Sequence, residues 1–292
     1  MSSPKLLVIV GPTAAGKSRL AMACAEALDG EIISADSVQV YRGLDIGSAK
    51  PTRAEQERVR HWCIDVIDPG TPFDATMWCQ MADKAIADIH ARGKTPIVCG
   101  GTGFYIRVLL RGLDELPAIS QQTRERVRAS MLEQGGRVMH RKLLEVDPVA
   151  AARIAPGDQQ RICRALEVYE QTGQPLSYFH AQTKSRPLRY PVSIVEVAPS
   201  RETLHEKILT RAKAMWDAGL ADEVARALDR GVSSKEGPLA SACYRPVVNF
   251  HLQSQQAPPV EAIAQAHRRY AKRQMTWLRG IGRRENDVTK VD

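Results

Sequence analysis

The chain has 292 residues, of which 43% are hydrophobic and 25% are charged. This is the balance of a folded globular protein and excludes a disordered or collagen-like chain. The formal net charge is +8 and the pI is near 9.3. A basic chain favours a polyanionic partner, although the charge alone fits a merely basic surface equally well.

Cysteine usage and the first residues indicate the compartment. The six cysteines are scattered without a C-x-x-C pair, which excludes the usual zinc spacing and indicates small core residues in a reducing environment. The sequence runs from Met1 directly into a short apolar segment, too short for a signal peptide or a membrane span. We therefore expect a cytoplasmic protein without membrane contact, and a monomer.

The first predicted elements form a phosphate-binding loop. The apolar run 6–10 predicts a buried strand, and Gly-Pro-Thr-Ala-Ala-Gly-Lys-Ser follows at 11–18, before a predicted helix at 19–28. Gly11 and Gly16 let backbone N–H groups point at an anion, Lys17 adds positive charge, and the Ser18 hydroxyl can ligate Mg²⁺. The chain is therefore predicted to bind a phosphate or a diphosphate.

Two further predicted strands end beside this loop. The run 31–34 leads to Asp36, whereas the run 96–99 ends in Gly-Gly-Thr-Gly at 100–103, where a P-loop ATPase usually carries an aspartate. At such an edge Asp36 fits a metal ligand, a general base or a helix cap. Gln39 fits either an adenine edge or a solvated surface, and Thr102 either a ligand contact or a tight turn.

Alternation of strands and helices continues with a helix at 76–92, a strand at 192–197 and helices at 201–218, 221–230 and 260–279. We predict an α/β fold, with a P-loop NTPase-like parallel sheet flanked by helices. Between about residues 120 and 180 only helical periodicity is found, punctuated by turns such as Gly135-Gly136 and Thr172-Gly173. The predicted domains are a core of residues 1–117 and 186–292 and an all-helical insertion of residues 118–185.

Basic residues cluster in two places. Residues 267–284 contain seven Lys or Arg and no acid. The insertion pairs Arg124 with Arg128 and Arg161 with Arg164, at spacings that bring side chains together on one helix face. These side chains suit the backbone of an RNA stem-loop, with a solvated helix face as the alternative for each single arginine.

Six blocks of the sequence resemble the tRNA dimethylallyltransferase family, in family order and over nearly the whole chain. They are the P-loop 11–18, Ser-Ala-Asp-Ser-Val-Gln-Val-Tyr-Arg-Gly at 34–43, Asp-Ile-Gly-Ser-Ala-Lys-Pro at 45–51, Gly-Gly-Thr-Gly-Phe-Tyr-Ile-Arg at 100–107, Gln-Arg-Ile-Cys-Arg-Ala-Leu-Glu-Val at 160–168 and Ala-Lys-Arg-Gln-Met-Thr-Trp-Leu-Arg at 271–279.

The resemblance implies a reaction. A dimethylallyl group would pass from dimethylallyl diphosphate to N6 of the adenosine 3′ of the anticodon in a tRNA, with diphosphate as the leaving group, Mg²⁺ as cofactor and no ATP consumed. Asp36 would accept the proton of the amine, and Thr102 would contact the bridging oxygen. Lys17 and Arg211 would complete the catalytic set.

The resemblance also implies two sets of binding residues. The diphosphate would be held by Gly11, Thr13, Ala14, Ala15, Gly16, Lys17 and Ser18. The tRNA would be held by Asp36, Ser37, Val38, Gln39, Thr102, Arg124, Gln160, Arg161, Ile162, Cys163, Arg164, Tyr244, Arg245, Lys272, Arg273 and Arg279. His61 and Asp65 match a family H-x-x-D, to which we assign a structural or channel-side role.

One segment departs from the family pattern. Around residues 241–246 an arginine and a glycine that the family usually carries are absent and Pro246 follows, so only Tyr244 and Arg245 are carried over. Three alternatives remain open from the sequence: a P-loop small-molecule kinase, a non-catalytic RNA-binding protein, and an adenylate isopentenyltransferase that uses a free nucleotide. The arginine-rich insertion favours tRNA over a free nucleotide.

Overall fold

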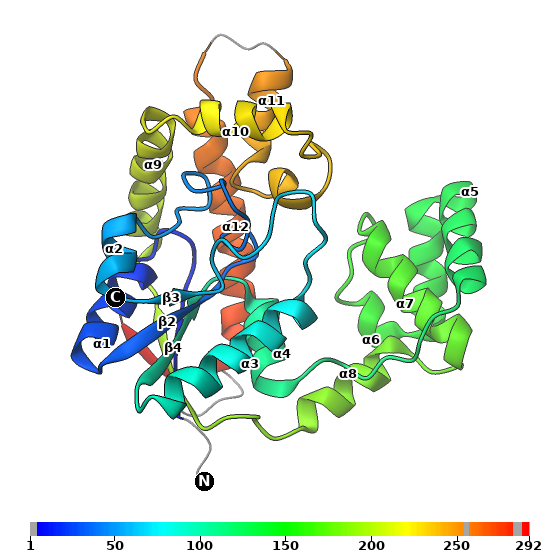
Figure 1. Ribbon diagram of the computed structural model, residues 1–292. Coiled ribbons are helices and arrows are strands. Elements are labelled where there is room, and N and C mark those ends of the chain that lie inside the picture. Colours follow the sequence, from blue (N-terminus) through cyan, green and yellow to red (C-terminus); the bar gives the residue numbers. More distant parts are fainter. Residues whose placement is uncertain (1–4, 254–256, 283–287, 292) are drawn as a thin grey trace. The chain divides into compact units, whose positions relative to one another are not determined.

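The computed structural model describes residues 5–253, 257–282 and 288–291. The chain divides into two compact units (Figure 1). Unit 1 comprises Met1–Leu110 and Tyr190–Asp292, and unit 2 comprises Arg111–Arg189. The sequence-based boundaries fall a few residues inside this division, at 118 and 185.

Unit 1 is built on a six-stranded parallel sheet with the order β3-β2-β4-β1-β5-β6. The strands are β1 (Leu6–Val10), β2 (Gly30–Ala35), β3 (His61–Trp62), β4 (Thr95–Gly100), β5 (Val192–Val197) and β6 (Val288–Val291). The predicted parallel sheet is confirmed. The edge strands β3 and β6 were not predicted, because two and four residues are too few for an alternation of apolar and polar side chains to stand out.

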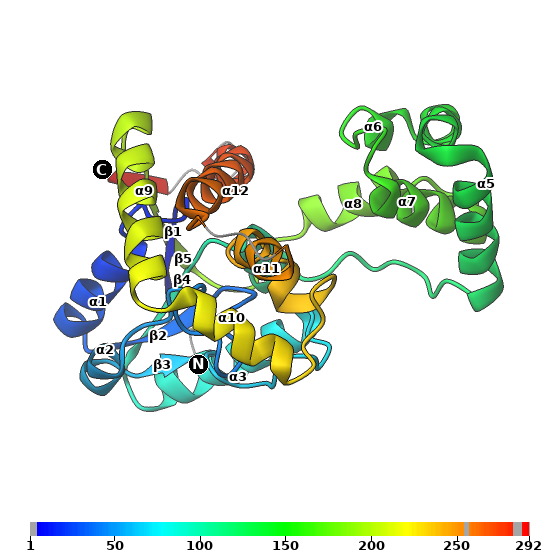
Figure 2. The same ribbon diagram turned by 90° about the horizontal axis from the view of Figure 1, so that it is seen from above.

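Helices connect these strands (Figures 1 and 2). They are α1 (Lys17–Ala27), α2 (Arg53–Arg58), α3 (Ala75–Ala91), α4 (Gly103–Arg111), α9 (Arg201–Asp217), α10 (Leu220–Asp229), the 3₁₀ helix η1 (Gly237–Ala240), α11 (Arg245–Leu252) and α12 (Val260–Gly282). The short helices α2, α4 and α11 were missed. Asp74 begins α3, where its carboxylate accepts hydrogen bonds from two backbone N–H groups.

The sheet is buried on both faces, as a parallel sheet requires. Ile9, Ile32 and Ile97 point to one face and pack with α1. Their neighbours Val8 and Val98 point to the other face, because side chains alternate along a strand. The helices α1 and α3 lie on opposite sides of the sheet (Figure 1).

The described residues of unit 2 form four helices, α5 (Gln121–Val146), α6 (Pro148–Ala151), α7 (Gln159–Thr172) and α8 (Leu176–Ser185). Gly135 has non-helical dihedral angles and interrupts α5, where the sequence predicted a turn. A separate apolar core, which includes Val127, Leu143 and Ile162, holds these helices together.

The strand order fixes where ligands can bind. The carboxyl ends of β1, β2 and β4 lie side by side, with Val10 and Ala35 both in register with Gly100. The segment after each end is therefore at one edge of the sheet, where open parallel sheets bind ligands. Within the described residues, no helix is long and apolar enough to span a membrane.

Candidate active site

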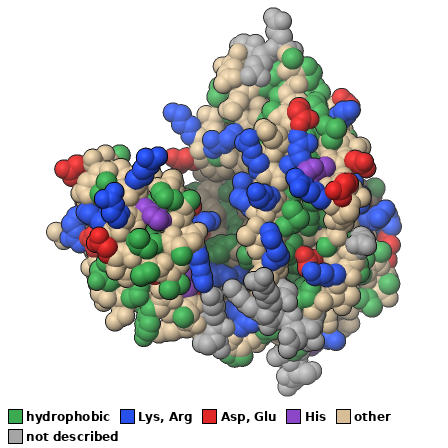
Figure 3. Space-filling view, turned by 180° about the vertical axis from the view of Figure 1, so that it is seen from behind, with side chains coloured by type: hydrophobic (Ala, Val, Ile, Leu, Met, Phe, Trp, Pro, Cys, Tyr) green, Lys and Arg blue, Asp and Glu red, His purple; other side chains and the backbone are tan. Residues whose placement is uncertain are grey.

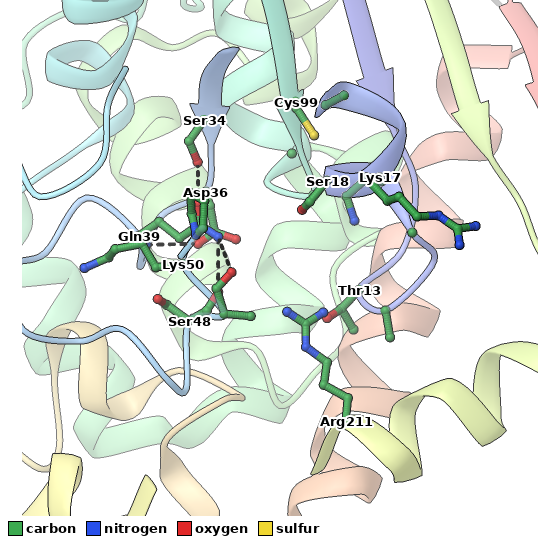
Figure 4. A pocket seen from close by; sticks show the side chains of 18 of the residues that line it. Thr13, Lys17, Ser18, Ser34, Asp36, Gln39, Ser48, Lys50, Cys99 and Arg211 are labelled. Atoms are coloured by element: carbon green, nitrogen blue, oxygen red, sulfur yellow. Dashed lines mark hydrogen bonds between the residues drawn. The ribbon is translucent and has the colours of Figure 1, made fainter. Parts of the chain in front are cut away.

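A cavity of about 380 Å³ opens at this edge of the sheet within unit 1 (Figure 4). Its walls come from the P-loop, the segment after β2, the end of β4, and the helices α9 and α12. Lys17, Ser18, Thr13 and Arg211 lie on one side, and Asp36 lies on the other with Gln39 and Ser48 (Figure 4). The cavity therefore has a cationic end and an end that carries a carboxylate.

The P-loop adopts a phosphate-binding shape. Gly11 has a φ of 157°, and a Cβ there would lie 2.6 Å from the Val197 carbonyl oxygen, so only glycine fits. Ala14 and Gly16 line the cavity, and Ala15 is buried beneath the loop. The Lys17 ammonium donates to the Pro12 carbonyl at 2.7 Å, folding its side chain back along the loop.

Among the described residues neither Lys17 nor Arg211 has an ion pair, and the charge of Asp36 across the cavity offsets theirs only in part. Burial lowers the pKa of Lys17 to about 8, and the neighbouring Arg211 contributes to this shift. Burial also lowers the pKa of Arg211. Within the described part of the chain, the Arg211 guanidinium has no hydrogen bond or ion pair. Two cations held this way would be stabilised by a bound anion.

Asp36 follows directly after β2. Its Oδ1 accepts hydrogen bonds from the backbone N–H groups of Val38 at 2.8 Å and Gln39 at 3.3 Å. No donor among the described residues reaches Oδ2. Asp36 therefore caps the turn after the strand with one oxygen, and its role as a base through the other oxygen stays a prediction.

Thr102 lies beside Asp36. Its hydroxyl accepts from the Ser37 N–H at 3.2 Å, and its own N–H donates to the Ala35 carbonyl at 3.1 Å. Thr102 thus holds both chain neighbours of Asp36. Tyr270 of α12 lines the cavity. The sequence analysis missed Tyr270, since a tyrosine in a helix carries no motif signal.

Gln39 is not free to bind an adenine edge through both amide groups. Its Nε2 donates to the carbonyl oxygens of Ser48 and Ala49 at 3.2 and 3.1 Å, and its Oε1 accepts from the Ser34 hydroxyl at 2.8 Å. Both amide protons are therefore used within the protein, and only an acceptor lone pair remains. In this conformation Gln39 shapes the wall of the cavity instead.

A buried carboxylate holds the loop 45–49 in place. Glu223 of α10 accepts hydrogen bonds from the backbone N–H groups of Asp45, Ile46 and Gly47 at 2.7 to 3.0 Å and from the Tyr244 hydroxyl at 2.7 Å. Because four donors meet one carboxylate, the loop that supplies acceptors to Gln39 is fixed. Glu223 was not found from the sequence, because it lies in no motif.

Tyr244 has no exposed surface. The sequence analysis expected it to contact RNA, and its buried, hydrogen-bonded hydroxyl indicates a structural part in this conformation. Arg245 next to it is exposed and donates to the Ala240 carbonyl. Val38 is also buried, at 7% exposure.

His61 and Asp65 lie beside the cavity. His61 lines it, and burial lowers the pKa of its imidazole. Asp65 forms an ion pair at 2.6 Å with the buried ammonium of Lys50, which also contacts Asp45. Lys50 thereby ties this segment to the loop 45–49.

The residues expected to bind tRNA fall into two groups. In unit 2, Arg124, Gln160, Cys163 and Arg164 line one groove of about 550 Å³. Arg161 is exposed, whereas the side chain of Ile162 is fully buried in the core of unit 2 and cannot face a ligand. In unit 1, Lys272, Arg273 and Arg279 are exposed on α12. Arg283 and Arg284 lie outside the described residues.

Comparison with known proteins identifies the family. The family model described as IPP transferase matches residues 39–281. The chain is 43% identical to a tRNA dimethylallyltransferase of Myxococcus xanthus over 94% of its own length and 90% of the relative's. It is 44% identical to a tRNA dimethylallyltransferase of Halorhodospira halophila over 96% and 91% of the two chains.

Solved structures give the same result. A tRNA isopentenylpyrophosphate transferase from Bacillus halodurans superposes with a TM-score of 0.71 at 34% identity, over 99% of this chain and 89% of the other. A eukaryotic dimethylallyltransferase acting on tRNA superposes with a TM-score of 0.81 at 25% identity, over 99% and 74%. The match covers most of the chain and the P-loop fold, so this chain belongs to the IPP transferase family.

Proposed function

We propose that this protein is a tRNA dimethylallyltransferase, which moves a dimethylallyl group from dimethylallyl diphosphate to N6 of the adenosine 3′ of the anticodon. Relatives named tRNA dimethylallyltransferase align with this chain over about nine tenths of their length. One observation carries the proposal: a single cavity holds cations without an ion pair at one end and a carboxylate at the other. A reaction that expels an anion and removes a proton needs both ends.

The cationic end suits the leaving group. When the bond between the allylic carbon and oxygen breaks, the electron pair stays on the diphosphate. Lys17, Arg211 and the N–H groups of the P-loop would stabilise that developing charge better than the less charged ester, which is the condition for catalysis. Arg211 is available for this role because its guanidinium has no ion pair among the described residues.

The other end suits the nucleophile. As N6 bonds to the allylic carbon, its proton must leave, and Oδ2 of Asp36 is the available acceptor. The two hydrogen bonds to Oδ1 would keep the carboxylate oriented while Oδ2 acts. Thr102, fixed to Ala35 and Ser37, would place its hydroxyl against the bridging oxygen.

The residues fit a magnesium ion with diphosphate. Ser18 lines the cavity next to Lys17, and none of the described hydrogen bonds uses its hydroxyl. We propose that Ser18 is a ligand of Mg²⁺, which would supply additional positive charge for the diphosphate. Asp36 is proposed as the acceptor of the N6 proton and not as a ligand of this metal.

The polymer substrate follows from the exposed basic residues. Figure 3 shows Lys and Arg side chains on the visible side of each unit. Arg124 and the half-buried Arg164 of unit 2, and Lys272 and Arg273 of unit 1, would contact the phosphates of an anticodon stem-loop. The target adenine would leave the loop to reach Asp36, at a cost of a few kcal/mol for a base that is already single-stranded. We place the reaction in the cytoplasm.

The kinase alternative is not favoured. β4 ends in Gly100, and Gly101 follows without a carboxylate for a nucleotide-bound metal. The family model matches residues 39–281, which lie outside the P-loop. A free nucleotide as acceptor is a closer alternative, and the test must separate it from tRNA.

Radiolabelled dimethylallyl diphosphate tests the proposal. The purified protein is incubated with Mg²⁺ and either unmodified tRNA or AMP. We expect label in tRNA, at one adenosine by nucleoside mass spectrometry, and none in AMP. Label in AMP alone would contradict the tRNA assignment, and label in neither would contradict prenyl transfer.

A further inference from the structure

Gln274 of α12 joins the two loops that carry the chemistry. Its Oε1 accepts a hydrogen bond from the backbone N–H of Thr13 in the P-loop at 2.8 Å. Its Nε2 donates to the carbonyl oxygen of Gly101 at 3.0 Å. The side chain is 7% exposed and forms part of the cavity wall. These partners are 261 and 173 residues away in the chain, so the contact is made by the fold alone.

The space around Gln274 is matched to this contact. A Cβ at Gly101 would lie 2.1 Å from Nε2 of Gln274, far inside the closest approach of real atoms. Gly101 therefore leaves room for the amide to reach its carbonyl. The hydrogen bond therefore requires both the long side chain of Gln274 and the absence of a side chain at Gly101.

The contact continues to the reacting groups. Gly101 precedes Thr102, whose hydroxyl and N–H hold Ser37 and Ala35 on either side of Asp36. On the other side, Thr13 belongs to the loop that presents Lys17 and Ser18. One amide therefore bridges the loop at the cationic end and the loop beside the carboxylate end of the cavity.

We propose that Gln274 is a positioning residue for prenyl transfer, which holds the P-loop and the Thr102 loop at the separation that aligns leaving group and nucleophile. The inference rests on the proposed function. Alignment errors of about 1 Å can cost about 10²-fold in rate. Binding of diphosphate depends instead on Lys17, Arg211 and the remaining N–H groups, which stay in place without Gln274.

The test replaces Gln274 by Met, which keeps the length of the side chain and removes both hydrogen bonds. The single-turnover rate of transfer to tRNA is expected to fall between about 10-fold and 10²-fold, measured where thermal unfolding shows the variant to be folded. Affinity for inorganic diphosphate is expected to change less than about threefold, far below the effect on the rate. Gln265→Met, on an exposed part of the same helix, is the matched control.

A double-mutant cycle separates positioning from stability. If Gln274 acts through Thr102, Gln274→Met should slow a Thr102→Ala enzyme much less than it slows the unmodified enzyme. Gly101→Ala should reproduce the loss by displacing the amide. Equal slowing in both backgrounds, or a Gln274→Met enzyme as fast as the control, would overturn the proposal. Absence of transfer by the unmodified enzyme would instead contradict the proposed function.

Discussion

At the scale of single residues, the site is organised around two buried cations, Lys17 and Arg211, that have no ion pair among the described residues. Lys17 has its pKa lowered to about 8 by burial, and Arg211 is affected in the same direction. A nearby anion would stabilise the charged form of both groups. We therefore expect an anion such as diphosphate to bind at this end of the cavity.

The pKa of Lys17 predicts coupling between binding and protonation. In the free protein Lys17 loses its proton as the pH rises through about 8, whereas bound diphosphate would keep it charged. Binding of inorganic diphosphate should take up a proton at about pH 9 and almost none at about pH 7. Calorimetry in buffers of different ionisation heat measures this uptake. The Lys17→Arg variant does not titrate in this pH range, so its proton uptake comes from diphosphate itself. Equal proton uptake by both proteins would refute the coupling.

A variant of Asp36 can separate its proposed role as a base from its role in capping the turn after β2. In Asp36→Asn the side-chain oxygen can still accept from the N–H groups of Val38 and Gln39, but no carboxylate remains. We expect tRNA affinity to stay within about threefold while turnover falls by about 10²–10⁴-fold. Filter binding and single-turnover transfer measure the two quantities. Full turnover in this variant would remove Asp36 from the mechanism.

At the scale of elements, α10 and α12 carry residues that build the cavity without following one of the strands that end there. Glu223 gathers three backbone N–H groups of the loop 45–49, together with the Tyr244 hydroxyl. These hydrogen bonds restrict the movement of the loop 45–49 beside the cavity. The carboxylate thus acts on the cavity through the backbone rather than through a ligand.

Removing this carboxylate should destabilise the fold. Glu223→Ala leaves four donors unpaired, of which the Gly47 N–H and the Tyr244 hydroxyl are buried, and we expect a loss of at least about 3 kcal/mol in the free energy of unfolding. Tyr244→Phe removes a single hydrogen bond and should cost about 1 kcal/mol, or up to about 3 for a bond to a charged group. Urea unfolding gives both values. Similar losses for the two variants would show that the backbone contacts contribute little.

These elements also show what could be predicted from the sequence. The P-loop, Asp36 and Thr102 follow strands directly, so local order in the chain places them at one sheet edge. Gln274, Tyr270 and Glu223 reach that edge from distant helices, and no local pattern encodes such contacts. The same lack of long-range information led to a free amide being assigned to Gln39, although Ser48 and Ala49 occupy it.

At the scale of the whole molecule, the net charge and the positions of the basic residues determine how the protein binds a polyanion. The chain carries a charge of +8, and exposed cations lie on α12 in unit 1 and along the groove of unit 2. Association with RNA through such side chains releases counterions. Each phosphate contact then leaves a signature in the salt dependence of binding.

Lys272→Ala is expected to weaken tRNA binding and to reduce the slope of log affinity against log salt by about one. The matched control is Lys84→Ala, which removes an exposed charge from α3, where no RNA contact is proposed. Titrations over a range of salt concentrations give both slopes. Equal slopes for the two variants would exclude Lys272 from the interface.

The most direct test of the central claim measures stoichiometry. The claim is that the P-loop holds a leaving diphosphate rather than a nucleoside triphosphate. Inorganic diphosphate and prenylated adenosine are quantified together, with tRNA, dimethylallyl diphosphate and Mg²⁺ but no nucleotide. We predict one diphosphate released for each adenosine modified. Product formation that requires ATP, or release of monophosphate instead, would contradict the account.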